Sequence, residues 1–447
     1  MTVTTTTQSE RLTDLAGLTD LTPLSETTSG SDPARVYEWL RARWGNVAPV
    51  LLEPGVPAWL VLGHRELVTV LRNEGLFSRD ARNWGLFTDG TVRADSGIGG
   101  VLAPRDGIYY VDGARHRHLR RLVDDAFESV DEHRLKSTVE YWCGLALDRV
   151  LAQGEADLVS DYARAVPVLV MSTMFGLDPE QARAMLGHSR RVFQAKGAAG
   201  LESLNAQRAL ISDLIAERRK APSDDLTSAI LRHPSAPTDL DAQSAVSATL
   251  ILGSEFEVGW ITQALRMRLT DPRFDGRSGG RLSASDTLEA VLGSTPPAPN
   301  AAPRFALADT TLGDRAIAAG DAVVPGILGA SAESRGGEDD IWLESGNLSY
   351  LTWGAGPHAC PARRVGRGGP GDPRDQRAGL TGRGTSNRTG SSRATDDQSV
   401  PAERSDSGGT VSDTPPRRRS AASTAICAIT VAGRRAGQAC GPAPHVR

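Results

Sequence analysis

The feature that most constrains this fold is one long helical stretch between Thr238 and Thr270. Thr238 and Asp239 are typical of a helix start, and Pro272 is typical of a stop. A helix of roughly 30 residues is well above the usual length. Because it must cross a whole domain, we expect it to be buried in the middle of that domain, along one apolar stripe: Val258, Ile261, Leu265 and Leu269.

The rest of the chain has helical spacing in its middle and short strand patterns on either side. Apolar residues three and four apart predict helices over 32–45, 64–73, 114–129, 134–154, 179–197 and 205–221. Two short strands are expected around the turn at Glu53, and a small hairpin within 304–326. This order favours a mainly α domain with minor sheets.

Composition divides the chain into three parts. Residues 1–30 are rich in Thr and Ser, and we expect them to be loosely ordered. Residues 31–364 look globular. From Gly354 to the end there is no Phe, Tyr or Trp, and Leu380 is the only leucine after Leu351. We therefore predict that residues 365–447 are disordered, because so little apolar surface cannot offset the entropy of ordering.

Charge and targeting signals exclude several classes of protein. The formal net charge of −4 gives no reason to expect a nucleic-acid partner. The four cysteines lack CxxC spacing, which argues against a disulfide scaffold or a zinc ribbon. Neither a signal peptide nor an apolar run long enough to span a membrane is visible. We expect a soluble cytoplasmic protein.

One cysteine lies in a distinctive segment, WGAGPHACPARR, at residues 353–364. Gly354 and Gly356 allow a tight turn and a close approach to a flat ligand. Pro361 suits the first position of a helix, and a thiol at a helix N-terminus near arginines has its thiolate stabilised. A thiolate is a strong ligand for haem iron, and His358 is placed to reach a carboxylate on such a ligand. A buried structural cysteine in a glycine-rich loop is the alternative.

This segment resembles the cysteine-ligand loop of the cytochrome P450 family, Phe-Gly-x-Gly-x-His-x-Cys-x-Gly. Gly354, Gly356, His358 and Cys360 match, while Trp353 and Ala362 replace the first Phe and the last Gly. The resemblance covers residues 30–365. It implies the family's fold, a mostly helical triangular prism with small β regions, and haem b (iron protoporphyrin IX) bound through Cys360.

The resemblance also implies residues that bind the haem propionates. The segment ARHRHLRRLVDDAF is similar to the family's C helix, which assigns His116 and Arg120 to this role. Arg304 corresponds to a third propionate contact, and His358 is the fourth. Taken alone, a helix face rich in His and Arg is more often solvated, and a single arginine is as often on the surface.

Three departures from the family pattern stand out. At the centre of the long helix, Glu255 keeps the acid, but Phe256 and Glu257 replace the usual pair of alcohols. Glu255 is either a proton donor acting through water or a side chain paired in the core. The family's Glu-x-x-Arg is missing, because Ala290 and Gly293 occupy those positions. Such a loss removes a buried network of ion pairs and hydrogen bonds.

The third departure is the segment after Arg364, which cannot form the amphipathic helix that follows the cysteine in the family, because Gly and Pro interrupt it. Its Arg-rich, Lys-free composition leads us to hypothesise that it comes from a shifted reading frame.

The function implied by the resemblance is that of a haem-thiolate monooxygenase. Electrons would come from a ferredoxin and its reductase, and one oxygen atom of O2 would be inserted into a small apolar substrate. Residues 84–110 would line the substrate pocket. Two alternatives remain open: a relative that keeps the fold and lacks catalysis, and a plain helical interaction protein.

Overall fold

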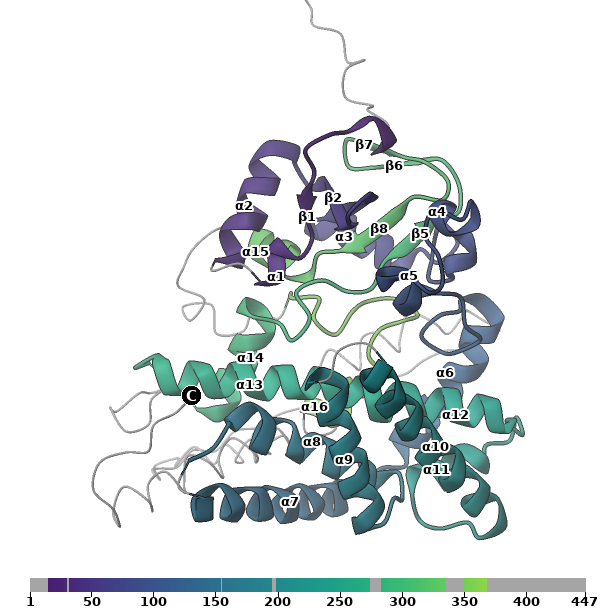
Figure 1. The fold of residues 1–447 in the computed structure, drawn as a ribbon, viewed down its shortest axis with the longest axis vertical. Coiled ribbons are helices and arrows are strands. Elements are labelled where there is room, and N and C mark those ends of the chain that lie inside the picture. Colours follow the sequence, from purple (N-terminus) through teal and green to yellow (C-terminus); the bar gives the residue numbers. More distant parts are fainter. Residues whose placement is uncertain are drawn as a thin grey trace, which may run out of the picture.

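The computed structural model describes residues 15–29, 32–153, 155–194, 198–273, 283–334 and 349–367. The predictions made for residues 1–14 and 368–447 lie outside these described residues. Figure 1 shows two parts: a sheet with a few helices at one end, and a larger group of helices at the other. Within the described residues no helix is long and apolar enough to cross a membrane.

The sheet part is built from both ends of the described chain. The six-stranded sheet has the order β1-β2-β3-β8-β5-β4, and β6 and β7 form a separate antiparallel pair. The strands are β1 (Thr22–Pro23), β2 (Val47–Glu53), β3 (Val56–Val61), β4 (Phe77–Ser78), β5 (Arg304–Ala306), β6 (Thr310–Leu312), β7 (Arg315–Ile317) and β8 (Ala322–Pro325). Because β8 pairs with β3 in parallel and with β5 antiparallel, the segment after residue 300 completes the sheet that the N-terminal residues begin.

The helices that accompany the sheet are α1 (Glu26–Ser29), α2 (Pro33–Trp44), α3 (His64–Arg72), α4 (Gly85–Thr88), α5 (Gly97–Leu102) and α15 (Ile327–Ser334). Three further helices contact the helical part: α6 (Gly113–Glu128) and α16 (Arg363–Arg367) pack against its core, and α14 (Ala284–Ser294) packs against the helix Ser254–Thr270. Asp32 caps α2 by accepting a hydrogen bond from Arg35 N, as expected from the Asp-Pro start.

The larger helical part consists of α7 (Glu132–Gln153), α8 (Ala165–Met174), α9 (Pro179–Gln194), α10 (Ala198–Lys220), α11 (Leu226–Leu231), α12 (Asp239–Ser247) and α13 (Ser254–Thr270). Short 3-10 helices occur at Leu15–Gly17 and Ala81–Asn83, and π-helical segments at Leu158–Ala163 and Ala248–Gly253. The mainly α prediction is confirmed.

The long helix is confirmed as a continuous helical run with a π-helical segment in its middle. Thr238 forms a capping box with Asp241 at its start, and α12, the π-helical segment and α13 follow without a break. Val258, Ile261 and Leu265 are buried, whereas Leu269 is 54% exposed, so the predicted stripe ends one turn early. π-Helical segments often occur at functional sites, and this one lies directly before Glu255.

The expectation for residues 1–30 needs correction over residues 15–29. Leu15 is buried against the sheet, and Thr22 pairs with Val50 in β2. The polar composition gave no indication of this docking, because one buried leucine and the two paired residues of β1 are enough to hold the segment against the sheet.

Three cores hold the molecule together. The largest fills the helical part, and two others cover the opposite faces of the sheet. A smaller cluster joins α13 to α14 through Trp260 and Leu288 and receives Trp353 from the cysteine segment. Each fully buried Leu, Ile or Val contributes about 1.5–3 kcal/mol, so these cores fix α6, α13 and the cysteine segment relative to one another.

Candidate active site around Cys360

The cysteine loop is shaped by two glycines in the left-handed region. Gly354 and Gly356 both have φ of +70°. A Cβ added to Gly356 would overlap the Leu71 carbonyl oxygen and lie 2.8 Å from Arg72 Cα, so only glycine fits there. Within the loop, Cys360 N donates to Trp353 O at 2.8 Å. The motif's glycines are therefore required by backbone geometry.

Helix α6 holds this loop through Arg120. Its Nη1 donates to Pro357 O at 2.9 Å and to Ala359 O at 2.6 Å, while its Nε donates to Asp124 at 2.7 Å. The resemblance implied a propionate contact for Arg120. In the structure its guanidinium binds loop carbonyls, which places it beside the predicted site in a loop-supporting position.

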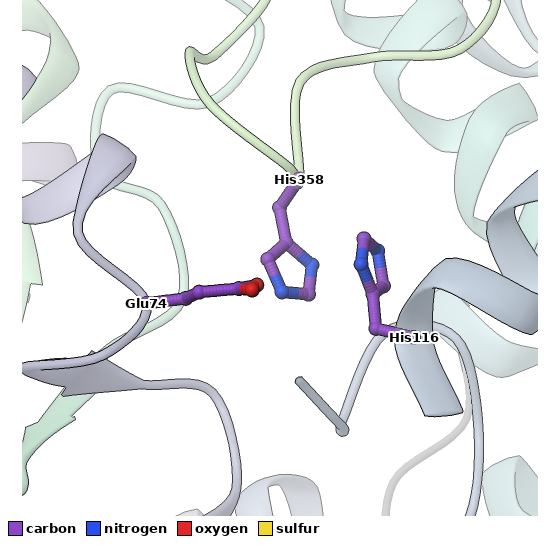
Figure 2. Close-up of side chains that lie close together, drawn as sticks. All are labelled: Glu74, His116 and His358. Carbon is purple, nitrogen blue, oxygen red and sulfur yellow. The ribbon is translucent and has the colours of Figure 1, made fainter. Parts of the chain in front are cut away.

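His116 and His358 lie against each other at the same site. Figure 2 shows His116 from α6, His358 from the cysteine loop and Glu74 converging. The two imidazole rings stack with centroids 3.8 Å apart. Burial lowers the pKa of His116 to about 4 and that of His358 to about 3, with nearby arginines adding to the effect. Both rings are therefore neutral at physiological pH, and His116 Nδ1 is buried without a hydrogen-bond partner.

Arg304 is the third basic residue that the structure brings here. Its side chain is 6% exposed, and within the described residues its guanidinium makes no hydrogen bond or ion pair. Burial lowers the pKa of Arg304 well below its usual range, and repulsion from Arg79 acts in the same direction. A buried guanidinium without a partner is costly, so an anionic group completes this site better than protein atoms do.

The charge of the cluster selects between a cation and an anion. Ligand atoms of Glu74, His116 and His358 lie within 4.8 Å of one another, which is a possible metal-ion arrangement. Besides burial, Arg120 disfavours a positive charge on His116 most, the Asp112 carboxylate opposes this effect, and Arg304 and Arg117 add to the effect of Arg120. The cluster therefore fits acidic groups such as haem propionates better than it fits a metal ion.

Cys360 itself is a free thiol at the end of the loop. Burial raises the pKa of Cys360 to about 11, and the Ala362 N–H and Arg120 lower it by less. The prediction of a thiolate stabilised by a helix N-terminus needs correction, because α16 begins only at Arg363 and has five residues. Coordination to a metal deprotonates a thiol outright. Iron binding would therefore stabilise the thiolate, which the helix N-terminus does not do here.

Glu255 interacts with a different set of residues. Its two carboxylate oxygens accept from Arg164 Nη1 at 2.6 and 2.8 Å, and Ser189 Oγ donates to it at 3.2 Å. Of the two alternatives for Glu255, a side chain paired in the core is the arrangement that the structure has.

The two residues after Glu255 have different environments. Phe256 is 47% exposed, although it is a large apolar side chain. Glu257 lines a cavity of about 50 Å³ with apolar residues of α7, α8, α13 and α16, and burial raises the pKa of Glu257 to about 7. The sequence identified both as departures but gave no sign that Glu257 would titrate near neutrality.

Other functional contacts were missed by the sequence. Asp112 accepts hydrogen bonds from His358, Ser78 and the backbone N–H of Arg79. The sequence indicates the position of Asp112 alone and not its partners, since an Asp just before a helical pattern is typical of an N-cap. Where the Glu-x-x-Arg is missing, Tyr350 O–H donates to Glu289, which links α14 to the segment leading into the cysteine loop.

Comparisons with known proteins agree on one family. No protein-family model matches the chain. Among curated proteins, nocardicin C N-oxygenase of Nocardia uniformis is 29% identical, over 71% of this chain and 81% of the relative. The 2-hydroxy-5-methyl-1-naphthoate 7-hydroxylase of Streptomyces carzinostaticus is 24% identical, over 72% and 81%. Mycinamicin IV hydroxylase/epoxidase of Micromonospora griseorubida is 26% identical, over 70% and 79%.

Solved structures show the same fold. CYP154C4 from a Streptomyces species superimposes with a TM-score of 0.65 over 74% of this chain and 83% of that one, at 24% identity. The cytochrome P450 MoxA from Nonomuraea recticatena gives 0.63 over 74% and 83%, also at 24% identity. Fold, cysteine loop and relatives together define a haem-thiolate oxidoreductase. The curated relatives and the solved structures are cytochrome P450s, and they support this chain as a member of that family.

Proposed function

We propose that this chain binds haem b through Cys360 and works as a monooxygenase on a small apolar substrate. The observation that carries the proposal is the free Cys360 thiol, presented by a loop that only glycines permit, beside the basic cluster of His116, Arg304 and His358. Haem iron with a thiolate ligand supplies dioxygen chemistry, in which the thiolate donates electron density that favours O–O cleavage.

The chain's own residues would hold and orient the haem. His116, Arg304 and His358, with Arg120 beside them, would bind the propionates, since neutral imidazole N–H groups and guanidinium groups are donors to carboxylates. Cys360 would lose its proton on binding iron. Glu255 is the acid that we assign to proton delivery, and its ion pair with Arg164 must open before it can donate.

Electrons would come from a ferredoxin and its reductase. This part of the proposal is supported only by the resemblance to bacterial members of the family, whose monooxygenases need an external electron donor and O2. Residues 84–110, which contain α4 and α5, would line the substrate pocket and exclude water from it.

The carbon monoxide spectrum of the purified full-length protein tests the proposal. After expression with a haem precursor and reduction under carbon monoxide, we expect the red-shifted Soret band that is diagnostic of thiolate ligation. Cys360→Ser should abolish this band, whereas Cys143→Ser, at the other described cysteine, should leave it. A protein that retains no haem, or a band that survives Cys360→Ser, would contradict the proposal.

A second candidate function is a haem-binding relative without monooxygenase activity. The observation that favours it is the first turn of α13, where Phe256 replaces an alcohol and Glu255 is ion-paired. Thiolate-type spectra combined with hydrogen peroxide as the sole product, across a panel of apolar substrates, would favour this candidate over the first.

A further inference from the structure

The carboxylate of Asp112 joins three segments that are distant in the sequence. Its Oδ2 accepts from Ser78 Oγ at 2.6 Å and from Arg79 N at 2.7 Å, and its Oδ1 lies 3.0 Å from His358 Nε2. The side chains of Asp112 and His358 are 16% and 11% exposed. Burial by itself raises the pKa of Asp112, but these hydrogen bonds outweigh it and lower the pKa to about 2. The carboxylate is therefore ionised, and the bond to His358 is charge-assisted.

Asp112 occupies the N-cap of α6 but does not cap it with its side chain. No hydrogen bond runs from its carboxylate to the first turn, although its backbone carbonyl accepts from His116 N at 3.3 Å. An Asp cap contributes about 1 kcal/mol to a helix. The side chain of Asp112 does not make this contribution, because it hydrogen-bonds to the cysteine loop instead.

Helix α6 thus contacts the cysteine loop at two places. Asp112, at its start, holds the side chain of His358, and Arg120, two turns later, holds the carbonyls of Pro357 and Ala359. Arg120 is itself fixed by Asp124. The contacted residues, 357–359, directly precede Cys360, so the position of the cysteine depends on both contacts.

We propose that Asp112 is a positioning residue, which clamps His358 and thereby holds the loop that presents Cys360. The inference rests on the proposed function for its meaning, since a fixed cysteine matters only if it binds iron. The clamp itself is a property of the haem-free protein, in which neutral His358 gives its one N–H to Asp112. With haem bound, His358 would need both ring N–H groups, and therefore a proton on each nitrogen, to contact Asp112 and a propionate together.

Hydrogen–deuterium exchange of the full-length, haem-free protein tests the clamp directly. Asp112→Ala should speed exchange of the backbone amides of Ala359 and Cys360 by roughly tenfold to a hundredfold, as expected for the loss of one charge-assisted hydrogen bond. Asp112→Asn should give a smaller increase, because an amide can still hydrogen-bond to the other tautomer of His358. The Asn variant also preserves shape and guards against a failure of the Ala variant to fold.

A double-mutant cycle separates positioning from general destabilisation. In a His358→Ala background, Asp112→Ala should cause little further increase in loop exchange, because its target is already gone. Asp321→Ala is the matched control. It removes a carboxylate that accepts from Trp59 Nε1 at 2.9 Å, and it should lower stability without speeding loop exchange. Additive effects, or an unchanged loop in Asp112→Ala, would overturn the proposal.

The haem-loaded protein provides the second readout. We expect Asp112→Ala to convert part of the red-shifted carbon monoxide band into the blue-shifted form that lacks thiolate ligation, while Asp321→Ala does not. If wild-type protein shows no red-shifted band, the proposed function fails but the exchange experiment still decides the clamp. If wild type shows the band and the exchange cycle is additive, the clamp alone fails.

Discussion

The basic side of the site and the first turn of α13 differ in how completely the protein determines them. On the basic side, residues 78–79 and the cysteine loop both hydrogen-bond to Asp112, and two backbone carbonyls of the cysteine loop accept from Arg120. In the first turn of α13, Glu255 is bound to Arg164, Phe256 is 47% exposed, and Glu257 faces an apolar cavity. The first region is held by many polar contacts, and the second contains groups whose role depends on what binds there.

This difference separates two tasks that the family normally combines. Holding the haem depends on the cysteine loop and its basic neighbours, which this chain keeps. Delivering protons depends on the acid and alcohol of the long helix, and here the alcohol is missing. We therefore expect haem binding and oxygen chemistry to respond differently to substitution.

The largest effect is expected from Gly356→Ala. The added Cβ would overlap the Leu71 carbonyl, and alanine in the left-handed region costs a further 1–2 kcal/mol or so. With overpacking, the total loss of folding free energy should be about 2–5 kcal/mol, and haem binding should fall with it. Urea unfolding followed by circular dichroism measures the first, and the Soret absorbance of the purified protein measures the second.

Gly354→Ala is the control for that prediction. Gly354 also has φ of +70°, but its added Cβ would meet Ala359 Cα at an ordinary 3.5 Å. It should cost only the conformational penalty, about 1–2 kcal/mol. Equal losses for the two variants would show that the close approach to Leu71 does not determine the loop.

A smaller effect, of opposite sign, is expected from Glu257→Gln. Burial raises the pKa of Glu257 from 4.5 to about 7, so between these values the folded protein binds more protons than the unfolded chain. Wild-type stability therefore falls as pH rises through this window and stays lower above it. Glutamine cannot ionise, so at pH 8 the variant should be more stable by on the order of 2 kcal/mol. Urea unfolding at several pH values from 5.5 to 8 measures the difference.

Glu255→Gln is the contrasting variant. It breaks the ion pair with Arg164, which is largely buried, and should lower the stability at pH 8. If Glu257→Gln lowers stability to the same extent as Glu255→Gln, then Glu257 has a stabilising partner and the contrast between the two acids is wrong.

The sequence predicted most of the helices, because their burial follows apolar spacing. The long helix, α6 and the strands on either side of Glu53 all formed where the pattern indicated. The docking of residues 15–29 was missed, since it depends on one buried leucine and on pairing with a strand about 30 residues away. Patterns of local spacing carry no information on such contacts.

The candidate site was predictable only where residues stand in a motif. The motif of the cysteine loop predicted its two glycines, and the resemblance to the family identified His116, Arg304 and His358. Asp112 and Arg79 belong to no motif, and they join the site only because β4 ends beside the start of α6. The partner of Glu255 was equally hidden, since Arg164 lies 91 residues earlier in the chain.

The smallest effect is expected from Phe256→Thr, which returns an alcohol to the first turn of α13. Because Phe256 is already 47% exposed, its replacement should change stability by no more than about 0.5 kcal/mol. Under the proposed function, the hydroxyl should lower the fraction of electrons released as hydrogen peroxide by a few-fold, far less than the 10²–10⁴-fold of a complete acid–base group, because the pair that Glu255 must break with Arg164 is still present. A surrogate ferredoxin and reductase allow this measurement. Phe256→Val matches threonine in shape without the hydroxyl, so an equal fall in peroxide for Val and Thr would mean that removing the ring, and not restoring the alcohol, changes the chemistry at α13.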